Sequence, residues 1–430
     1  MRPPKLIRAR AIVSALLVTT SCIAGAQVSN ASTAATGLSG AFTARATGYN
    51  AVAWNPANLA MPGNPSFSFT LLAIDGAASL KPIDLARIQP YSGKLVPASE
   101  RELWMLDVTA DSGQKGAIGG GVTLFGLSIG RLAFTANTKF AADMNLAPDA
   151  VEAVLFGNAG RTGTVKNLSL AGSGFQSAFY STGAVSFGQS LSSLVPLTNF
   201  AVGATVKYTV GHVLLLGLDD GSALNTNSIK LAFPYVVTDT ASARTGSSGG
   251  GVGLDVGAAW TIPRFRFGVT AQNVFNSFKW DTTKLVTRSA TGTFDSQVNS
   301  FTADTVDKPY GTAPASIRSK VAGLKFKPVL AAGVAFDPIP KLTLSADIRL
   351  QAGGGIEVGP ASLVGLGAEI KIIPFIPLRA GVSAMSDGFG ASGGVGIHLL
   401  GFEVGVAGFL RKRNGGTESG GTINLFSIRP

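Results

Sequence analysis

The chain of 430 residues is 46% hydrophobic and only 14% charged, contains 55 glycines and carries a formal net charge of +11. Soluble globular domains have about 25% charged residues and about 7% glycine, so an ordinary soluble enzyme is disfavoured. Beyond the N-terminal region, no stretch reaches the roughly 18 consecutive apolar residues of a membrane-spanning helix, which excludes a helical membrane protein. A chain that is apolar overall but nowhere continuously apolar favours β-strands with one apolar face.

Residues 1–26 have the pattern of a cleavable secretory signal peptide. Four basic residues precede the apolar stretch 11–18, and Ala24-Gly25-Ala26 forms a small-residue cleavage site. The alternative is lipidation at Cys22, although the preceding residues lack the leucine that such sites usually contain. Cleavage after Ala26 removes the only cysteine and lowers the net charge from +11 to +7. We therefore expect an exported protein without disulfides or thiol chemistry and, because no basic patch remains, without a nucleic-acid partner.

Residues 27–64 form a small-residue segment ahead of the first expected strand. The segment contains Trp54-Asn55-Pro56-Ala57. Proline fixes the backbone and removes a donor, and the asparagine side chain can bond neighbouring backbone, so these residues predict a rigid corner. A corner explains the motif without any ligand.

Residues 65–430 show alternation of apolar and polar side chains. In residues 341–351, one face is made of Leu342, Leu344, Ala346, Ile348 and Leu350, and the other face is polar or charged. Elsewhere the polar face consists mostly of Gly, Ala, Ser and Thr with an occasional ion. A β-sandwich would expose more charge to water, so this pattern favours the lumen of an all-β, antiparallel transmembrane β-barrel.

The alternation predicts about fourteen strands. They are expected at 65–74, 116–125, 127–138, 175–187, 199–213, 250–261, 264–276, 326–337, 341–352, 362–373, 377–386, 391–400, 402–411 and 421–428. Short turns are expected at Gly126, Pro263, 338–340, 374–376 and Gly401, and long excursions at 75–115, 139–174, 214–249, 277–325 and, more modestly, 412–420. Outer-membrane barrels place short turns in the periplasm and long loops outside, so both chain ends should be periplasmic. The apolar stretch 229–237 is assigned to the external excursion 214–249 because a further single strand would break the even number.

The long excursions contain two expected helices, and aromatic residues gather near the strand ends. A capping box at Ser99–Glu102 and a first-turn Pro148 predict the helices. They either shape a binding surface or pack on the rim. The aromatic residues suit a girdle at the membrane interface, or ordinary packing; they are Phe67, Phe69, Trp260, Phe265, Phe267, Phe275, Phe278 and Trp280.

The N-terminal motif resembles a known group, the fatty-acid-transporter-like outer-membrane barrels. This group includes the barrels that accompany surface-protein secretion in Bacteroidetes-type bacteria. Its members open with a small-residue segment and an aromatic-Asn-Pro-Ala-x-Leu motif, which Trp54 to Leu59 match; Gly253 to Ala258, Asn273 and Trp280 also look similar. The resemblance implies a fourteen-strand barrel whose residues 27–64 fold inward as a plug. In the transporter branch such a plug guards the route of a hydrophobic ligand through the wall.

Six charged residues on neighbouring expected strands should face the lumen. They are Asp347, Arg349, Glu369, Lys371, Arg379 and Glu403. Charges persist inside a barrel when they are paired or wetted. They therefore form either a salt-bridge ladder that fills the lumen and holds the plug, or a polar path or ligand clamp.

Catalytic and metal-binding material is sparse. Only His212 and His398 are present, and Gly390 to Gly394 matches G-x-S-x-G but leads into an alternating strand rather than a strand-to-helix turn. We expect no enzyme activity, no metal and no cofactor.

The leading hypothesis is therefore an outer-membrane barrel that binds or transports hydrophobic small molecules such as long-chain fatty acids. The alternative is a non-transporting barrel that holds or shuttles a secreted or surface protein through its external loops. Expected partners are outer-membrane lipid and the barrel-assembly machinery. That machinery often reads a terminal aromatic residue, whereas here Phe426 lies four residues before the end.

Overall fold

The computed structural model describes residues 31–429, except 158, 160, 194–198, 226–227, 296–298, 305, 353–355, 357–360 and 414–415. The expected signal peptide, residues 1–26, lies outside the described residues.

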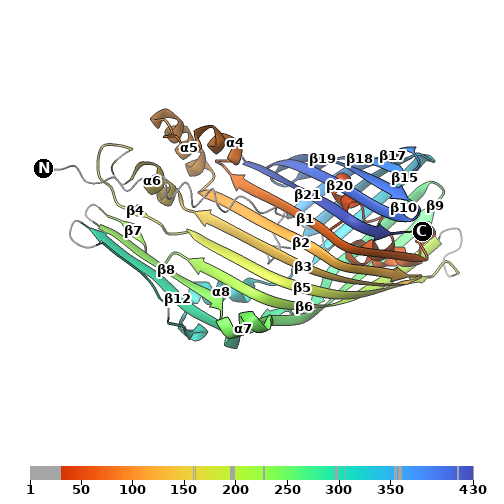
Figure 1. The fold of residues 1–430 in the computed structure, drawn as a ribbon, viewed down its shortest axis with the longest axis horizontal. Helices are drawn as coiled ribbons and strands as arrows, with labels where there is room; N and C mark the ends of the chain where they lie inside the picture. The colour runs from red at the N-terminus through yellow and green to blue at the C-terminus, as the bar shows by residue number, and fades with distance from the viewer. Residues whose placement is uncertain are drawn as a thin grey trace.

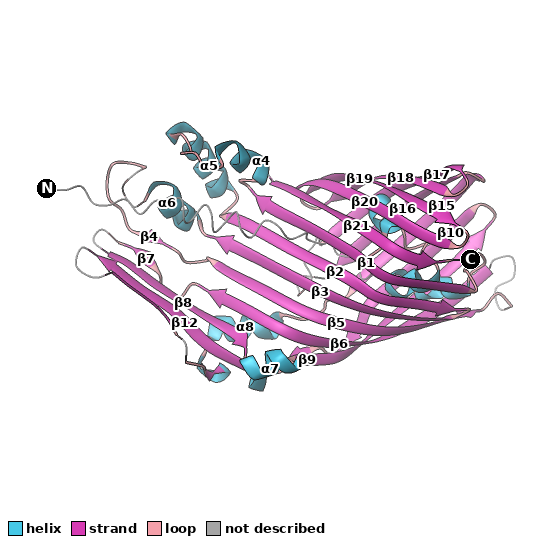
Figure 2. Ribbon diagram, in the orientation of Figure 1, coloured by secondary structure: helices cyan, strands magenta, loops and turns pink. Residues whose placement is uncertain are grey.

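Fourteen long strands form a closed antiparallel barrel, as predicted (Figures 1 and 2). Each strand pairs with the next, and the last pairs back with the first. In order, the strands are β1 (Phe67–Lys81), β2 (Gln114–Ile129), β3 (Leu132–Leu146), β5 (Gly174–Ser190), β6 (Asn199–Leu218), β9 (Gly249–Ile262), β10 (Phe265–Asn276), β15 (Val329–Ile339), β16 (Leu342–Gln351), β17 (Ser362–Ile373), β18 (Ile376–Met385), β19 (Gly388–Leu399), β20 (Phe402–Arg413) and β21 (Gly416–Ile428).

The two barrel ends differ in the length of their connections. Short turns join β9 to β10, β15 to β16, β17 to β18 and β19 to β20 at one end, which Figure 1 shows at the right together with the C-terminus. The predicted turn at Gly126 is wrong, because Gly126 lies within β2 and the chain turns at Gly130-Arg131. A side chain at Gly126 would come within 2.9 Å of the Tyr49 ring, so the glycine serves close packing rather than a turn.

The opposite end carries the long excursions and their short elements. Helices there are α4 (Leu85–Ile88), η4 (Gln89–Tyr91), α5 (Ala98–Ala110), α6 (Pro148–Phe156), α7 (Thr240–Thr245), η5 (Thr282–Lys284), η6 (Tyr310–Thr312) and α8 (Ala315–Gly323). Strands there are β4 (Leu168–Ser169), β7 (Ala223–Leu224), β8 (Ser228–Thr238), β11 (Lys279–Trp280), β12 (Leu285–Asp295), β13 (Asn299–Ala303) and β14 (Lys308–Pro309). The stretch 229–237 is outside the barrel ring, as predicted, but it is a strand that pairs with β12 in a projecting ribbon (Figure 1).

The expected helices form, with one difference at a cap. Helix α6 begins at Pro148, as predicted. Helix α5 begins at Ala98, its N-cap is Pro97, and no side chain caps it, so the capping box at Ser99–Glu102 is wrong. Glu100 instead accepts a hydrogen bond of 2.5 Å from Trp104 Nε1 one turn later. Among these outer elements, Asp239 caps α7, and hydrogen bonds from Ser242 hold the pKa of Asp239 below its usual range.

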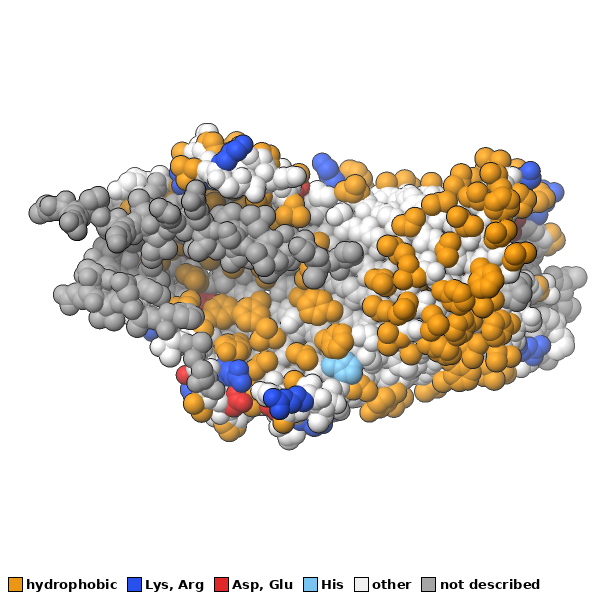
Figure 3. All heavy atoms as spheres, viewed as in Figure 1, with side chains coloured by type: hydrophobic (Ala, Val, Ile, Leu, Met, Phe, Trp, Pro, Cys, Tyr) orange, Lys and Arg blue, Asp and Glu red, His pale blue; other side chains and the backbone are white. Residues whose placement is uncertain are grey.

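The outer surface of the barrel is apolar over the half nearest the short turns, where orange side chains gather in Figure 3. Leu344, Leu366 and Val406, for example, are large apolar side chains of which 41–52% is exposed. Such a band is the surface that lipid tails cover. Stacked rings lie close to the short turns, including Trp260 on Phe267 with centroids 5.2 Å apart.

Two of the expected girdle aromatics lie elsewhere. Phe278 and Trp280 are buried in an apolar cluster with Leu214, Leu216 and Ile317, at the end of the barrel that carries the long excursions. They pack under α8 and the ends of β5 and β6 and not against lipid. No helix among the described residues is long and apolar enough to cross a membrane.

The N-terminal segment lies inside the barrel, and we call residues 32–64 the plug. Its helices are α2 (Thr33–Gly37), η2 (Gly48–Asn50), α3 (Ala51–Trp54) and η3 (Pro56–Ala60), drawn in red within the barrel in Figure 1. Helix α2 contacts β18 to β21, η2 contacts β1 to β3, and η3 contacts β5, β6 and β9. The plug thus touches most of the barrel circumference, and most of its residues from Ser32 to Leu59 are buried.

Candidate functional site

The Asn55-Pro56-Ala57 corner of the plug is held by both ends of the Asn55 amide. Asn55 Oδ1 accepts a 3.1 Å hydrogen bond from Ala57 N, and Nδ2 donates a 3.0 Å bond to Ala258 O of β9. Asn58 extends the arrangement, since its Nδ2 donates to the carbonyls of Thr43 and Ala46 at 3.0 and 2.8 Å. The corner therefore fastens the plug to itself and to the wall.

Glycines in the wall make room for this corner. Gly188, Gly203 and Gly257 are aligned across β5, β6 and β9, with Gly203 opposite the other two. A Cβ on Gly203 would lie 2.4 Å from Ala57 N, and one on Gly257 would lie 2.1 Å from Asn55 Oδ1. We call these three glycines the glycine groove. Because these three residues have no side chain, the plug backbone at Asn55 to Ala57 can lie directly against the wall.

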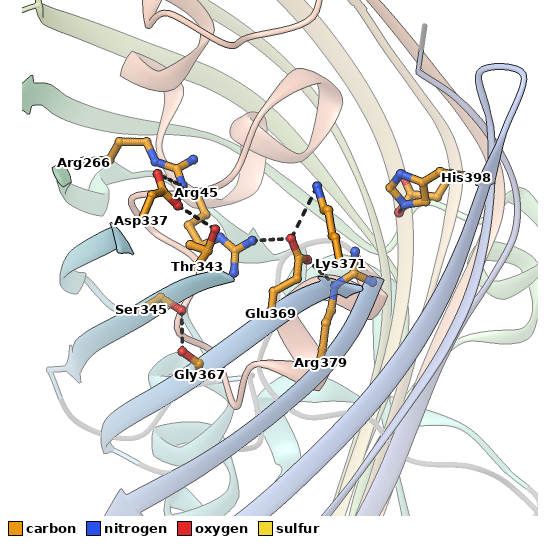
Figure 4. A network of polar contacts seen from close by, with 11 residues as sticks. Arg45, Arg266, Asp337, Thr343, Ser345, Gly367, Glu369, Lys371, Arg379 and His398 are labelled. Carbon is orange, nitrogen blue, oxygen red and sulfur yellow. Dashed lines mark hydrogen bonds and ion pairs between the residues drawn. The ribbon is translucent and has the colours of Figure 1, made fainter. Parts of the chain in front are cut away.

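Glu369 is the centre of a buried ion cluster between plug and wall (Figure 4). Arg45 of the plug binds Glu369 Oε1 through Nη2 at 2.8 Å, and Arg379 of β18 binds Oε2 through Nε at 2.7 Å. Lys371 lies 3.7 Å away and is more exposed, at 45% of its side chain. Two guanidinium groups on one carboxylate compensate its burial, so this cluster ties the plug to β17 and β18.

Asp347 and Arg349 of β16 meet the plug at separate points. Asp347 Oδ2 accepts a 2.7 Å hydrogen bond from Thr43 N, and Asp347 is 5% exposed. Arg349 donates to Gln272 Oε1 at 3.0 Å, and its guanidinium lies 5.9 Å from the centre of the Trp54 ring. Gln272 in turn donates to Ala53 O at 2.6 Å. The two charges of β16 therefore contact plug backbone and the Trp54 ring rather than the Glu369 cluster.

Glu403 lies apart from the other five expected charges. It is 9% exposed on β20, and its Oε1 is 3.1 Å from His398 Nε2 on β19. The six residues thus belong to three groups, of which two touch the plug. Arg45, Gln272 and the glycine groove were not singled out from the sequence. The one signal that could have found them is the resemblance, because it places a plug inside the barrel and so implies that wall residues contact plug residues.

A pocket lies in the lumen beside the plug, on the side of the long excursions. Val52 and Ala53 of the plug form its floor, and inward-facing residues of β3, β5, β6, β9 and β10 form its wall. Asp255 and Lys207 are paired there, with Lys207 Nζ 2.7 Å from Asp255 Oδ1. Phe326, which follows α8, contributes an apolar side, and the space measures about 630 Å³, including the part open to solvent.

The wall beside this pocket is interrupted between β10 and β15. β15 pairs with β10 only from Phe265 to Gln272, and the register of β10 against β9 shifts between Ala271 and Phe275. Asn273, at φ 53°, stands at the shift and closes the gap with a 3.0 Å bond from its Nδ2 to Lys327 O. We call the stretch between residues 273–276 and 324–328 the wall break. Its inner rim, formed by Asn273 and Asn276, lines the pocket.

The outer rim of the wall break is apolar. Val274 and Phe275 of β10 are 47% and 56% exposed, and Leu330 of β15 is 59% exposed. At the break, therefore, an apolar outer surface and the lumenal pocket are separated by a single layer of chain.

The sequence offered few candidates for catalysis or metal binding, and their surroundings in the structure are as follows. The described residues contain no group of three or more His, Cys, Asp or Glu side chains placed to hold a metal. Ser392 of the G-x-S-x-G match lies within β19, and its hydroxyl donates to Gly37 O of the plug at 3.0 Å.

Comparison with known proteins places the fold. No protein-family model and no curated protein sequence matches the chain. The toluene transporter TodX of P. putida has a TM-score of 0.53 at 11% identity, over 94% of this chain and 99% of that one. The toluene transporter TbuX of Ralstonia pickettii gives 0.49 at 15% identity over 94% and 99%, and a FadL homologue of Pseudomonas aeruginosa gives 0.46 at 14% over 95% and 99%. The fold of this chain, a closed antiparallel barrel of fourteen strands with an internal N-terminal segment, is therefore similar to that of TodX.

Proposed function

We propose that this protein is an outer-membrane barrel, exported by its signal peptide, that passes small hydrophobic molecules between the outside and the lipid through the wall break. The observation that carries the proposal is the junction of three features at one place: the pocket, the plug below it and the break beside it. The similar fold of TodX, described as a toluene transporter, supports the same class of cargo.

The plug favours a sideways route over a straight one. It is buried against the wall by the Asn55 corner, the Glu369 cluster and Asp347, so a molecule in the pocket has packed protein beneath it. The wall break requires far less movement, since the bond from Asn273 Nδ2 to Lys327 O is the one hydrogen bond that crosses it among the described residues. The free energy of an apolar molecule falls by about 25 cal/mol for each Å² of its apolar surface that moves from water into lipid.

The height of the break suits exit into lipid. Eight residues of β10, Phe265 to Gln272, separate it from the short turn. At about 3.4 Å per residue and a tilt of about 40°, they rise about 20 Å, whereas the apolar band of such barrels is about 25 Å tall. The break therefore opens into the outer part of the band.

Uptake measurements test the proposal. A deletion strain is compared with the same strain carrying the wild-type gene, using labelled toluene and a labelled long-chain fatty acid as separate cargoes. We expect the wild-type gene to speed entry of at least one of them. Equal entry of both cargoes in the two strains refutes the transport function, and entry of toluene alone restricts the cargo class.

The partner-protein alternative rests on the outer end. The ribbon of β8 and β12 projects beyond the barrel, and α5 exposes Leu103 and Leu106 at 53% and 59%. These surfaces suit contact with another protein. Isolation of the native barrel from outer membranes with a stoichiometric protein partner, together with unchanged uptake after deletion, would favour this function over transport.

A further inference from the structure

The pocket beside the plug is polar for a site that is to receive hydrophobic cargo. Hydroxyl, amide and charged side chains from five successive barrel strands face it. Its charged side chains are Lys139, Lys207 and Asp255. Both Asp255 oxygens are engaged by Lys207, and Asp255 Oδ1 also accepts a 2.7 Å bond from Asn273 N. A pure hydrocarbon in the pocket would leave this ion pair intact. It has no donor or acceptor, so it would form no hydrogen bond with a polar group that lacks one.

Asn137 of β3 provides the unpaired group. It lines the pocket, is 8% exposed, and its Nδ2 donates only a long 3.4 Å bond to Thr135 Oγ1. Among the residues that the structure describes, none donates a hydrogen bond to its Oδ1. A buried acceptor without a donor is costly, and a bound molecule that supplies an O–H or N–H recovers that cost.

The pocket also has an apolar side. Phe326 and Tyr180 meet edge to face with ring centroids 5.1 Å apart, and Val52 and Ala53 of the plug continue the apolar surface. An aromatic body would lie against these residues while its polar group reaches Asn137. An ionised carboxylate only accepts hydrogen bonds, so it supplies no donor for Asn137 Oδ1.

We infer that the pocket binds neutral amphipathic molecules, an aromatic or aliphatic body with one hydroxyl, through a hydrogen bond to Asn137 Oδ1. This inference rests on the proposed function and narrows its cargo class. A phenol is the simplest such molecule, since its hydroxyl donates and stays protonated near neutral pH.

Three matched probes test the inference on the full chain in lipid nanodiscs: 4-ethylphenol, 4-ethyltoluene and 4-ethylbenzoate. Affinities are measured by calorimetry against empty nanodiscs, which correct for partition into lipid. We expect wild type to bind 4-ethylphenol about three- to tenfold more tightly than either other probe, the range for one recovered hydrogen bond. Equal affinity for the phenol and the hydrocarbon, or tighter binding of the benzoate, overturns the inference.

Two variants locate the effect. Asn137→Leu keeps the side-chain size but removes the acceptor, and we expect it to lose the phenol preference while still binding the hydrocarbon. Asn145→Leu makes the same change on the same strand outside the pocket and should keep the preference. A preference that persists in Asn137→Leu overturns the assignment. Accelerated uptake of all probes without any preference would remove this inference and leave the transport function standing, whereas neither binding nor uptake of any probe would remove both.

Discussion

The glycine groove makes a quantitative prediction about how the plug is seated. Gly203→Ala places a Cβ 2.4 Å from Ala57 N and Pro56 C, backbone atoms that cannot rotate away. Restoring an ordinary contact of 3.4 Å requires the corner to retreat by about 1 Å. Overpacking of this kind costs about 1–3 kcal/mol, which corresponds to about five- to 150-fold weaker docking of the plug.

Hydrogen–deuterium exchange of the purified barrel measures this effect. Amides of residues 41–60 should exchange faster by that factor in Gly203→Ala, while those of β16 to β18 stay unchanged. Gly183→Ala is the matched control, because a Cβ at Gly183 on β5 meets nothing within 4 Å and carries the same entropic change of the unfolded chain. Equal protection of residues 41–60 in the two variants would refute the reasoning.

Four further substitutions, in two matched pairs, test the assignment of the buried ion cluster and of the lipid face. Glu369→Gln should lower the free energy of unfolding by about 3–5 kcal/mol, because it leaves buried guanidinium groups without a counter-charge, whereas Asp337→Asn at the half-exposed pair with Arg266 should cost at most about 1 kcal/mol. Leu366→Arg on the lipid face should cost about 2–4 kcal/mol, but Leu400→Arg at a short turn, where the side chain is 89% exposed, should cost little. Urea unfolding in detergent measures all four, and equal losses within either pair would contradict the assignment of faces.

The alternation of side chains was enough to predict the barrel. Strands whose outer face meets lipid and whose inner face meets a packed lumen must alternate, as Leu342 to Leu350 do. The number fourteen came from counting the alternating segments and keeping their number even. The strand ends were less predictable. Residues 326–328 were assigned to a strand, but Phe326 turns inward against Tyr180 and the strand begins at Val329.

Glycine was the main source of error and of missed information. Gly126 was interpreted as a turn because glycine ordinarily punctuates strands, yet it makes room for Tyr49 of the plug. Gly203 and Gly257 were not singled out, because their purpose depends on Pro56 and Asn55, which lie about 150 or more residues away in sequence. Contacts of that kind follow from strand register, which a single sequence does not specify.

The wall break could not be predicted either. Residues 264–276 were expected as one regular strand, and nothing in their alternation marks Asn273 as the point where β10 leaves β15. The six expected lumenal charges are each placed by the structure, but their division into three groups depends on Arg45 and Gln272. Their part in gating or in binding ligand stays a proposal.

A reversible tether across the wall break tests the central claim most directly. Asn273→Cys combined with Lys327→Cys joins the two rims where the Asn273 side chain already bonds Lys327 O. The control, Thr270→Cys combined with Ala331→Cys, joins the same two strands where they pair in register. With toluene efflux from proteoliposomes as the readout, we predict that oxidation blocks passage only in the first variant and that reduction restores it. Passage that continues through the oxidised first variant at the rate of the control would contradict the account.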